Sequence, residues 1–394
     1  MIYLDNHSTT RVDPRVVEAM LPTFDAQYGN AGSITHETGM DAYELVEQAT
    51  ESISDFINAS PEEIVFTSGA TESNNLAIRG VCDRLKTPGH IVTSTVEHKA
   101  VLDPIARLER SGFSVTRLQV GRFDGCSAGM IEIEELADAI NDRTQLVSIM
   151  LGNNEIGTLQ DLAAIGEICA KRGVLLHTDA TQAIGKIPID VDALQVDLMS
   201  FSAHKLYGPK GVGGLYVRQK GKRVRLASQI DGGGQQSGLR SGTLNVSGIV
   251  AMSKAIELCS DELCGPDPER LRGLRDLLYE RLCDGLGELP INGLPLISRD
   301  RLQSNLNCRF PGLNASSLMT IADSIAVSSG SACTSAEPEP SHVLMGLGLG
   351  EDEVHCSLRF GIGRFNTRSE IIEAADCIIS AGKQLRSLGD ASVE

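Results

Sequence analysis

From about residue 60, the chain alternates short runs of β-branched and apolar residues with longer amphipathic runs. The short runs predict strands at 62–68 (EEIVFTS), 90–96 (HIVTSTV), 145–151 (QLVSIML), 174–180 (VLLHTDA) and 196–204 (VDLMSFSAH). The longer runs predict helices at 70–85, 99–112 and 162–173. Strands that alternate with helices in this way favour an α/β fold with a mostly parallel sheet covered on both faces.

The pattern changes at LCGPDPERL (263–271), where a glycine and two prolines interrupt the helical periodicity. The segments that follow are predicted to be a helix at 270–286, strand-like NLNCRFPG, SIAVSSGSACTS and VHCSLRFGIG, and a final helix from about Ser369. About 130 residues of mixed helix and strand are enough for a second, smaller α/β domain.

Composition narrows the possible classes of protein. The 394 residues are 41% hydrophobic, which is enough for a large core, and the net charge is −17 without any run of Lys or Arg. We therefore expect no direct binding to nucleic acid or to an anionic membrane. No apolar run is long enough to span a bilayer and MIYLDNHSTT does not resemble a signal peptide, so we expect a soluble, cytoplasmic protein.

The ten cysteines do not form a disulfide or zinc pattern. The nearest two are Cys259 and Cys264, and the chain contains no CxxC or HxxxH motif, which favours a reducing compartment and no structural metal. Cys169 and Cys377 lie in apolar helical periodicity and are expected to be small core residues. Cys333 differs, because it lies in SSGSACTS (328–335), where small residues predict a mobile loop with an exposed thiol.

Polar and ionisable residues follow five of the predicted strands. The motifs are GATES, EHKA, GNNEIG, DATQ and HKLYGPKG, and sheets of this type bind ligands at the carboxyl ends of their strands. Gly69, Ala70 and Thr71 lead into a helix, so they form either a phosphate site or an ordinary turn with Thr71 as helix cap. Lys205 and Asp179 are each expected at a strand end, where a charge is costly unless it is paired or used. Each could be a local cap or ion pair, but together they suggest a Schiff-base lysine with an acidic partner for the pyridinium of pyridoxal phosphate.

Eight motifs in order carry a resemblance to a known family: GATES, VEHKA, NNEIG, HTDATQ, SFSAHKLYGPKG, RSGTLN, SSGSACTS and SLRFGIGRFNT. The sequence resembles the cysteine desulfurases, within them the group with the SSGSACTS loop, from YLDNHSTT to GRFNT. The resemblance implies a fold-type-I pyridoxal phosphate enzyme, a homodimer and a seven-stranded large domain. It implies a large domain at 16–262, a small domain formed by 1–15 with 263–394, and a reactive loop at about 328–341.

The same resemblance implies a role for each matching residue. Lys205 would carry the cofactor, Asp179 would hold the pyridine nitrogen protonated, and His98 would stack on the ring. Gln182 would contact the ring oxygen, and Asn154 would lie beside the ring and the substrate. Arg359 and Asn30 would contact the substrate. The phosphate would be bound by Ala70, Thr71, Ser202, His204 and the partner subunit's Thr243. Without the resemblance, a lone histidine such as His98 is more often an ordinary structural residue, and Arg359 would be a surface guanidinium.

The implied reaction converts L-cysteine to L-alanine and leaves the sulfur on Cys333 as a persulfide. Lys205 would take the Cα proton, and Cys333 would carry the sulfur to an acceptor such as an iron–sulfur cluster scaffold or a thiolation enzyme. A loop of small residues suits a thiol that must both collect and deliver sulfur. The alternatives are a selenocysteine lyase and a non-turnover sulfur-trafficking scaffold, although a scaffold would be expected to lose at least one of these residues.

The sequence departs from the family in two places. Pro338 and Pro340 stand where one proline is expected, which would stiffen the trailing half of the loop. DNHSTT replaces the common DNAATT, so we expect His7 to modify the cofactor cleft.

Overall fold

A seven-stranded sheet forms the centre of the larger part of the molecule. The computed structural model describes residues 1–329 and 339–390, and in these residues the strand order is β2-β8-β7-β6-β5-β3-β4. The strands are β2 (Ile64–Thr67), β3 (His90–Ser94), β4 (Ser114–Leu118), β5 (Thr144–Ser148), β6 (Leu175–Asp179), β7 (Leu198–Ser202) and β8 (Gly213–Val217). Only β8 runs antiparallel to its neighbours, so the predicted α/β fold with a mostly parallel sheet is confirmed.

Successive residues of each strand face opposite layers of helices. Ile91 and Leu198 pack with the layer of α3 (Ala70–Cys82) and α4 (Lys99–Arg110). Their neighbours Val92 and Met199 belong to the core on the other face. The helices that contribute to that core include α1 (Pro14–Met20), α2 (Glu37–Phe56), α5 (Ile133–Ala139), α6 (Leu162–Arg172) and α7 (Val246–Leu263). Burial on both faces explains why these strands read as continuous apolar runs.

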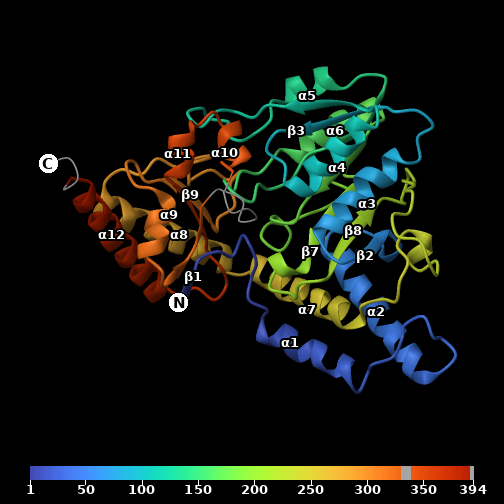
Figure 1. The fold of residues 1–394 in the computed structure, drawn as a ribbon. Coiled ribbons are helices and arrows are strands. Elements are labelled where there is room, and N and C mark those ends of the chain that lie inside the picture. The colour runs from blue at the N-terminus through green and yellow to red at the C-terminus, as the bar shows by residue number, and fades with distance from the viewer. Residues whose placement is uncertain (330–338, 391–394) are drawn as a thin grey trace.

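A second apolar cluster lies beside the sheet and joins the two ends of the chain (Figure 1). It is built from α8 (Asp267–Leu286), α9 (Ala315–Ile321), α12 (Arg368–Asp390) and the antiparallel strands β11 (Ser328–Ser329), β12 (Ser357–Gly361) and β9 (Asn305–Arg309). The N-terminal strand β1 (Ile2–Tyr3) pairs with β10 (Ile325–Ala326), and Ile2 and Leu4 are buried in this cluster. The division at 1–15, 16–262 and 263–394 stays a prediction.

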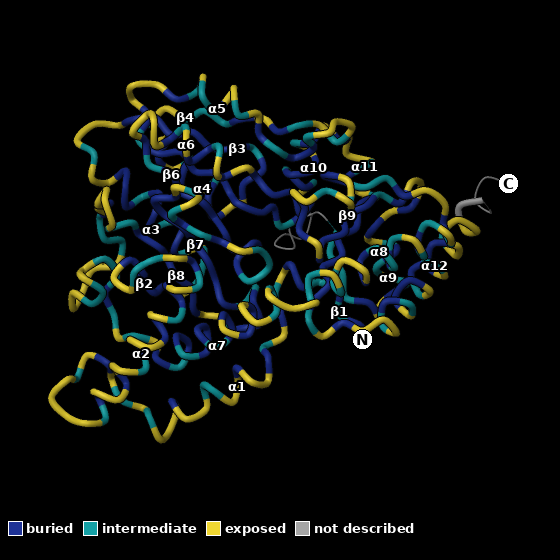
Figure 2. Tube along the Cα trace, turned by 180° about the vertical axis from the view of Figure 1, so that it is seen from behind, coloured by how far each residue is buried: buried dark blue, intermediate teal, exposed yellow. Residues whose placement is uncertain are grey.

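The two apolar clusters are connected through short helices. Val343 and Leu344 in α10 (His342–Gly346) and Val354 in α11 (Glu351–His355) pack into the core of the main sheet. Ile325 before them and Leu358 after them pack in the second cluster. Four 3₁₀ turns complete the elements in the described residues: η1 (Leu21–Phe24), η2 (Pro61–Glu63), η3 (Ala203–Lys205) and η4 (Gln236–Gly238). Figure 2 shows the buried chain concentrated in the sheet and its helix layers, with exposed chain at α1 and at the turn before α2.

The structure agrees with the predicted strands and helices within a few residues at their ends. It adds β4 and β8, which the sequence pattern did not indicate. β4 (SVTRL) is a partly exposed edge strand, and β8 (GGLYV) begins with two glycines, so neither carries a clear apolar run. Cys169 is buried as expected, whereas Cys377 is only half-buried at the margin of its cluster. None of the described helices is both long and apolar enough to cross a membrane.

Candidate active site

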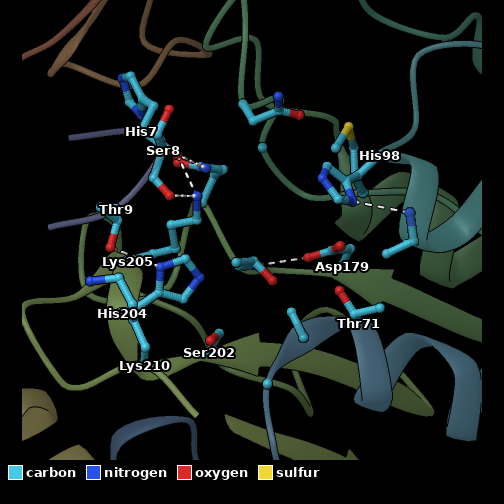
Figure 3. A pocket seen from close by; sticks show the side chains of 18 of the residues that line it. His7, Ser8, Thr9, Thr71, His98, Asp179, Ser202, His204, Lys205 and Lys210 are labelled. Carbon is cyan, nitrogen blue, oxygen red and sulfur yellow. Dashed lines mark hydrogen bonds between the residues drawn. The ribbon is translucent and has the colours of Figure 1, made fainter. Parts of the chain in front are cut away.

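A cavity of about 630 Å³ opens at the carboxyl ends of the parallel strands. Its walls come from residues that follow β2, β3, β5, β6 and β7, together with residues 7–9 and Arg359 of β12. The predicted site residues that line it are Ala70, Thr71, His98, Asn154, Asp179, Gln182, Ser202, His204, Lys205 and Arg359. Figure 3 shows that several of them converge on one space. The five strand exits singled out by the sequence pattern therefore meet, as parallel strands require.

Lys205 projects its amine across the cavity towards the N-terminal segment. It lies in η3, directly after β7, and its Nζ donates to the carbonyl oxygens of His7 at 2.5 Å and Ser8 at 2.6 Å. Burial and the nearby Arg359 guanidinium lower the pKa of Lys205 to about 8, against an opposing effect of Asp5 and Asp179. The amine therefore has a substantial neutral, nucleophilic fraction near neutral pH.

Asp179 ends β6 on the opposite wall (Figure 3). Its Oδ2 accepts a hydrogen bond from Asn74 Nδ2 at 2.7 Å, and its Oδ1 accepts one from the Thr181 backbone N–H at 2.9 Å. Asn74 lies one turn into α3, on the face that packs against the sheet. The carboxylate is thus fixed by neutral donors rather than by a cation, which leaves its charge for a group in the cavity.

The N-terminus of α3 forms a cradle for an anion. Gly69 precedes the helix with a φ of 150°, a conformation that favours glycine, and Ala70 and Thr71 supply the first helical N–H groups. A Cβ on Gly213 would lie 2.7 Å from Gly69 Cα, so glycine at that position lets β8 pass close to the turn. Ser202 and His204 line the same part of the cavity.

His98 and Gln182 also line the cavity. His98 is the N-cap of α4, where its Nδ1 accepts from the Ala100 backbone N–H at 3.1 Å. This bond leaves the face of the imidazole ring available to the cavity. Gln182 donates from Nε2 to the His7 carbonyl at 2.9 Å, and its Oε1 lies 3.1 Å from His7 Nδ1.

Arg359 enters from β12, in the second part of the molecule. It is 7% exposed, and its guanidinium donates to the Asn154 carbonyl, to Asp5 Oδ1 and to Ser8 Oγ at 2.8–3.0 Å. The side chain is therefore held at the cavity wall by two segments that are distant from it in sequence, residues 5–8 and Asn154.

Two predicted residues do not line the cavity, and a third cannot be placed. Thr243, between η4 and α7, is exposed and is not among the lining residues. Asn30 is also exposed, and its Oδ1 accepts from the Gly32 backbone N–H in a local turn. Cys333 lies outside the described residues. Both Thr243 and Asn30 stay predictions, because a single chain does not bring them to the cavity.

The sequence reasoning missed other residues of the site. Ser8, Thr9 and Lys210 line the cavity, and Asn74 donates a hydrogen bond to Asp179 from α3. The departure DNHSTT was a signal for the N-terminal wall, but it did not indicate that the His7 and Ser8 carbonyls would accept from Lys205. Asn74 lies four residues after Ala70, so helical spacing could have placed it on the same face of α3.

Comparison with known proteins identifies the family. The model of class-V aminotransferases matches residues 2–373. The chain is 49% identical over 390 residues to cysteine desulfurase IscS of Escherichia coli O139:H28, covering 98% of this chain and 94% of the relative. The chain belongs to the cysteine desulfurase family. Members of this family are fold-type-I enzymes that depend on pyridoxal phosphate.

Solved structures agree with this family assignment. A NifS-like protein superposes with a TM-score of 0.87 at 37% identity, covering 96% of this chain and 98% of the other. SspA in complex with cysteine superposes with a TM-score of 0.80 at 34% identity, covering 93% of this chain and all of the other. The likeness in both cases spans nearly the whole length of this cysteine desulfurase.

The groups around the cavity fit pyridoxal phosphate. A primary amine, a carboxylate on the opposite wall and a helix N-terminus with nearby hydroxyl and imidazole groups match the aldehyde, the pyridine nitrogen and the phosphate of the cofactor. Gly69 and Gly213 keep the cradle open, since a Cβ on Gly213 would press against the turn.

Proposed function

We propose that this cysteine desulfurase converts L-cysteine to L-alanine and holds the released sulfur on Cys333 as a persulfide for transfer to an acceptor protein. The observation that carries the proposal is the convergence of Lys205, Asp179 and Arg359 on one cavity in a chain of this family. An amine, an acidic partner and a guanidinium in this arrangement suit an amino-acid substrate bound to pyridoxal phosphate.

Lys205 is the proposed proton carrier. Pyridoxal phosphate, when bound, supplies the electron sink that allows the Cα proton of an amino acid to leave. Since its pKa is lowered to about 8, Lys205 can accept that proton near neutral pH and return it later. Asp179 would hold a proton on the pyridine nitrogen through its fixed negative charge, and Ala70, Thr71, Ser202 and His204 would bind the phosphate.

Arg359 is the proposed partner of the substrate carboxylate. Its guanidinium is nearly buried, and the cavity that it lines also contains Asn154. A substrate carboxylate that binds there would share the Arg359 guanidinium with Asp5. Because Asp5 neutralises the guanidinium only in part, Arg359 would still attract the substrate. Replacing Arg359 by Lys should raise KM for L-cysteine by at least tenfold, because lysine cannot make a planar bidentate pair.

The transfer of sulfur to Cys333 needs no external oxidant. The Cys333 thiolate attacks the substrate sulfur, an S–S bond forms, and the C–S bond breaks. The carbon fragment keeps the electron pair of that bond and takes up the proton of the substrate thiol, which gives alanine and an enzyme persulfide.

The direct test is Cys333→Ala with Cys126→Ala as matched control. Cys126 is an exposed free cysteine that is not among the lining residues of the cavity. We expect Cys333→Ala to lose persulfide formation and keep the cofactor absorbance, and Cys126→Ala to keep both. Continued release of alanine and sulfide at the full rate in Cys333→Ala would contradict the proposal, and parallel assays with L-selenocysteine would identify a lyase of the alternative type.

We further propose that the enzyme works as a homodimer. Large apolar side chains are exposed around η1 and the start of α2, namely Leu21, Phe24, Tyr28, Ile34, Met40 and Tyr43. A second copy that covers this surface would remove it from water. The predicted phosphate contact of Thr243 would then come from the partner subunit, in agreement with the exposed position of Thr243 in one chain.

Mixed dimers test the sharing of sites. Lys205→Ala and Thr243→Ala are each expected to be impaired alone. If Thr243 acts across the interface, a hybrid of the two contains one intact site and regains activity. If Thr243 acts within its own chain, both sites of the hybrid are defective, and absence of recovery would refute the shared site.

The proposed acceptor is a cytoplasmic protein, such as an iron–sulfur cluster scaffold or a thiolation enzyme. The net charge of −17 opposes direct delivery to nucleic acid or to an anionic membrane. Loading the enzyme with ³⁵S-labelled cysteine and adding a purified candidate acceptor should move the label to the acceptor only when Cys333 is present.

A further inference from the structure

His7, which marks the departure of this sequence from the family pattern, is packed against the cofactor-contacting Gln182. The imidazole is 1% exposed, and its Nδ1 lies 3.1 Å from Gln182 Oε1. The backbone carbonyl of the same residue accepts from Gln182 Nε2 at 2.9 Å and from Lys205 Nζ at 2.5 Å. His7 is therefore in contact with a predicted cofactor ligand. It is also in contact with the predicted catalytic amine of Lys205 (Figure 3).

The partners of Gln182 determine the orientation of its amide. Lys186 Nζ, which can only donate when charged, lies 3.1 Å from Oε1, and the His7 carbonyl, which can only accept, lies against Nε2. The opposite orientation would place donor against donor and acceptor against acceptor. Since His7 Nδ1 faces an oxygen, it carries the proton, and the imidazole is the neutral Nδ1–H tautomer.

The hydrogen bonds of Gln182 limit which donor or acceptor it can present to the cofactor. Its oxygen has two acceptor positions, and both are taken, by His7 and by Lys186. Its NH₂ group has two protons, of which the His7 carbonyl takes one. Among the described residues, one N–H donor of Gln182 has no partner, and this donor matches an anionic ring oxygen and not a hydroxyl donor.

A glycine in β12 lets the segment of Asn6 and His7 approach closely. Gly361, in β12, has no positive φ, so its backbone does not require glycine. A Cβ there would lie 2.8 Å from His7 Cδ2 and 2.7 Å from the His7 backbone nitrogen. Glycine inside a strand is unfavourable, and the space that it leaves is filled by His7 and its neighbour Asn6.

We propose that His7 is a positioning residue for the cofactor ring oxygen: its Nδ1–H holds the Gln182 amide so that a single N–H donor faces that oxygen. The inference rests on the proposed cofactor site and extends it to a residue that touches the cofactor only through Gln182. His7 Nε2 is buried and accepts no hydrogen bond from the described residues, so Gln182 is the one hydrogen-bonding partner of the ring among them.

Other charged groups surround this pair and bear on any pH dependence. Burial, Lys186 and Arg359 keep the pKa of His7 well below its usual value, so the ring stays a neutral donor at neutral pH. The groups that face His7 and Gln182 from neighbouring elements are the cations Lys186, Lys205 and Arg359, with the carboxylates Asp5 and Asp179 behind Lys205. Burial lowers the pKa of Lys186 to about 7, so Lys186 changes charge near neutral pH. Of the two donors to Gln182 Oε1, His7 is the one that keeps its charge state there.

The test compares His7→Leu with His7→Asn in the holoenzyme. Both side chains fill similar space, but only Asn retains an N–H near the position of Nδ1. A donor to the ring oxygen withdraws electron density from it and lowers the pKa of the absorbance transition of the lysine-bound cofactor. We expect His7→Leu to raise that pKa by about half a unit to one unit, the range of one hydrogen bond, and His7→Asn to stay at the wild-type value.

A double-mutant comparison separates this role from a structural one. In a Gln182→Ala background the Leu and Asn variants should give the same transition, because the amide through which His7 acts is absent. His7→Ala replaces His7→Leu if the latter does not melt cooperatively. Equal shifts in Leu and Asn, no shift in Leu, or a Leu–Asn difference that persists without Gln182 would each overturn the proposal. A wild-type protein without a borohydride-sensitive cofactor band would instead refute the proposed function.

Discussion

At the residue scale, the chemistry depends on ionisable side chains whose charged form is destabilised by burial. The lowered pKa of Lys205, about 8, comes first from burial and then from Arg359. Only the neutral amine attacks an aldehyde, so covalent capture of pyridoxal phosphate by the apoenzyme should accelerate as pH rises through about 8 and then level off. Stopped-flow absorbance across pH 6.5–10 measures the profile, and an Asp5→Asn variant should lower its midpoint. A midpoint near that of ordinary lysine, about 10.4, would contradict this assignment.

Glu97 provides a second prediction at this scale. It is fully buried beside His98, and burial raises its pKa to about 8 although the Met150 N–H and Ser94 hydroxyl donate to Oε1. Between the unfolded pKa near 4.3 and about 8 the folded state binds more protons, so this residue makes the free energy of unfolding fall as pH rises.

Glu97→Gln should remove that dependence. Its stability relative to wild type should increase by on the order of 1.4 kcal/mol per pH unit across this window and level off above pH 8. Urea denaturation of both proteins from pH 5 to 9 measures the difference. A constant difference across the range would show that Glu97 does not titrate as the burial indicates.

At the element scale, β8 and α3 approach each other through glycine. Gly213→Ala places a Cβ 2.6 Å from the Phe201 carbonyl and 2.7 Å from Gly69 Cα, so the phosphate cradle must shift. We expect weaker binding of pyridoxal phosphate, by at least tenfold, and a lower melting temperature. The matched control is Gly273→Ala at an exposed position of α8, where the added Cβ meets no atom within 4 Å and should raise stability by about 1 kcal/mol. Unchanged cofactor affinity in Gly213→Ala would mean that the cradle does not depend on this contact.

At the scale of the whole molecule, Arg364 joins the two parts of the fold. It follows β12, pairs with Asp13 at the start of α1 and with Glu262 at the end of α7, and lies 4.0 Å from the Tyr207 ring centroid. Arg364→Lys loses the planar fork and leaves the buried Asp13 and the half-buried Glu262 less well paired, so we expect a loss of about 3 kcal/mol in the free energy of unfolding.

The Arg364 prediction has an exposed control. Arg272→Lys alters a surface pair with Glu269 and should change stability by less than about 0.5 kcal/mol. Urea denaturation and limited proteolysis of both variants measure the effect. A similar response in the two proteins would show that the Arg364 network does not hold the parts together.

Much of this architecture was predictable because it follows from local pattern. The buried strands β2, β3, β5, β6 and β7 read directly as short apolar runs, and the polar residues after them were predicted to meet. β4 and β8 were missed because partial exposure in one and leading glycines in the other hide their strand character. The contacts of Asn74 and His7 were missed because each depends on which helix or segment the fold brings alongside.

The sequence by itself determined the alternation of strands and helices, the cluster of polar groups at the strand exits and the family, since these follow from periodicity and from motifs. Only the tertiary structure decided that residues 7–9 line the cavity, that Asn154, Asp5 and Ser8 hold Arg359 at its wall, and that one N–H donor of Gln182 has no partner among the described residues. The physical reason is that burial, pKa and hydrogen-bond partners are properties of surroundings. Those surroundings are built from segments as distant as His7, Gln182 and Gly361.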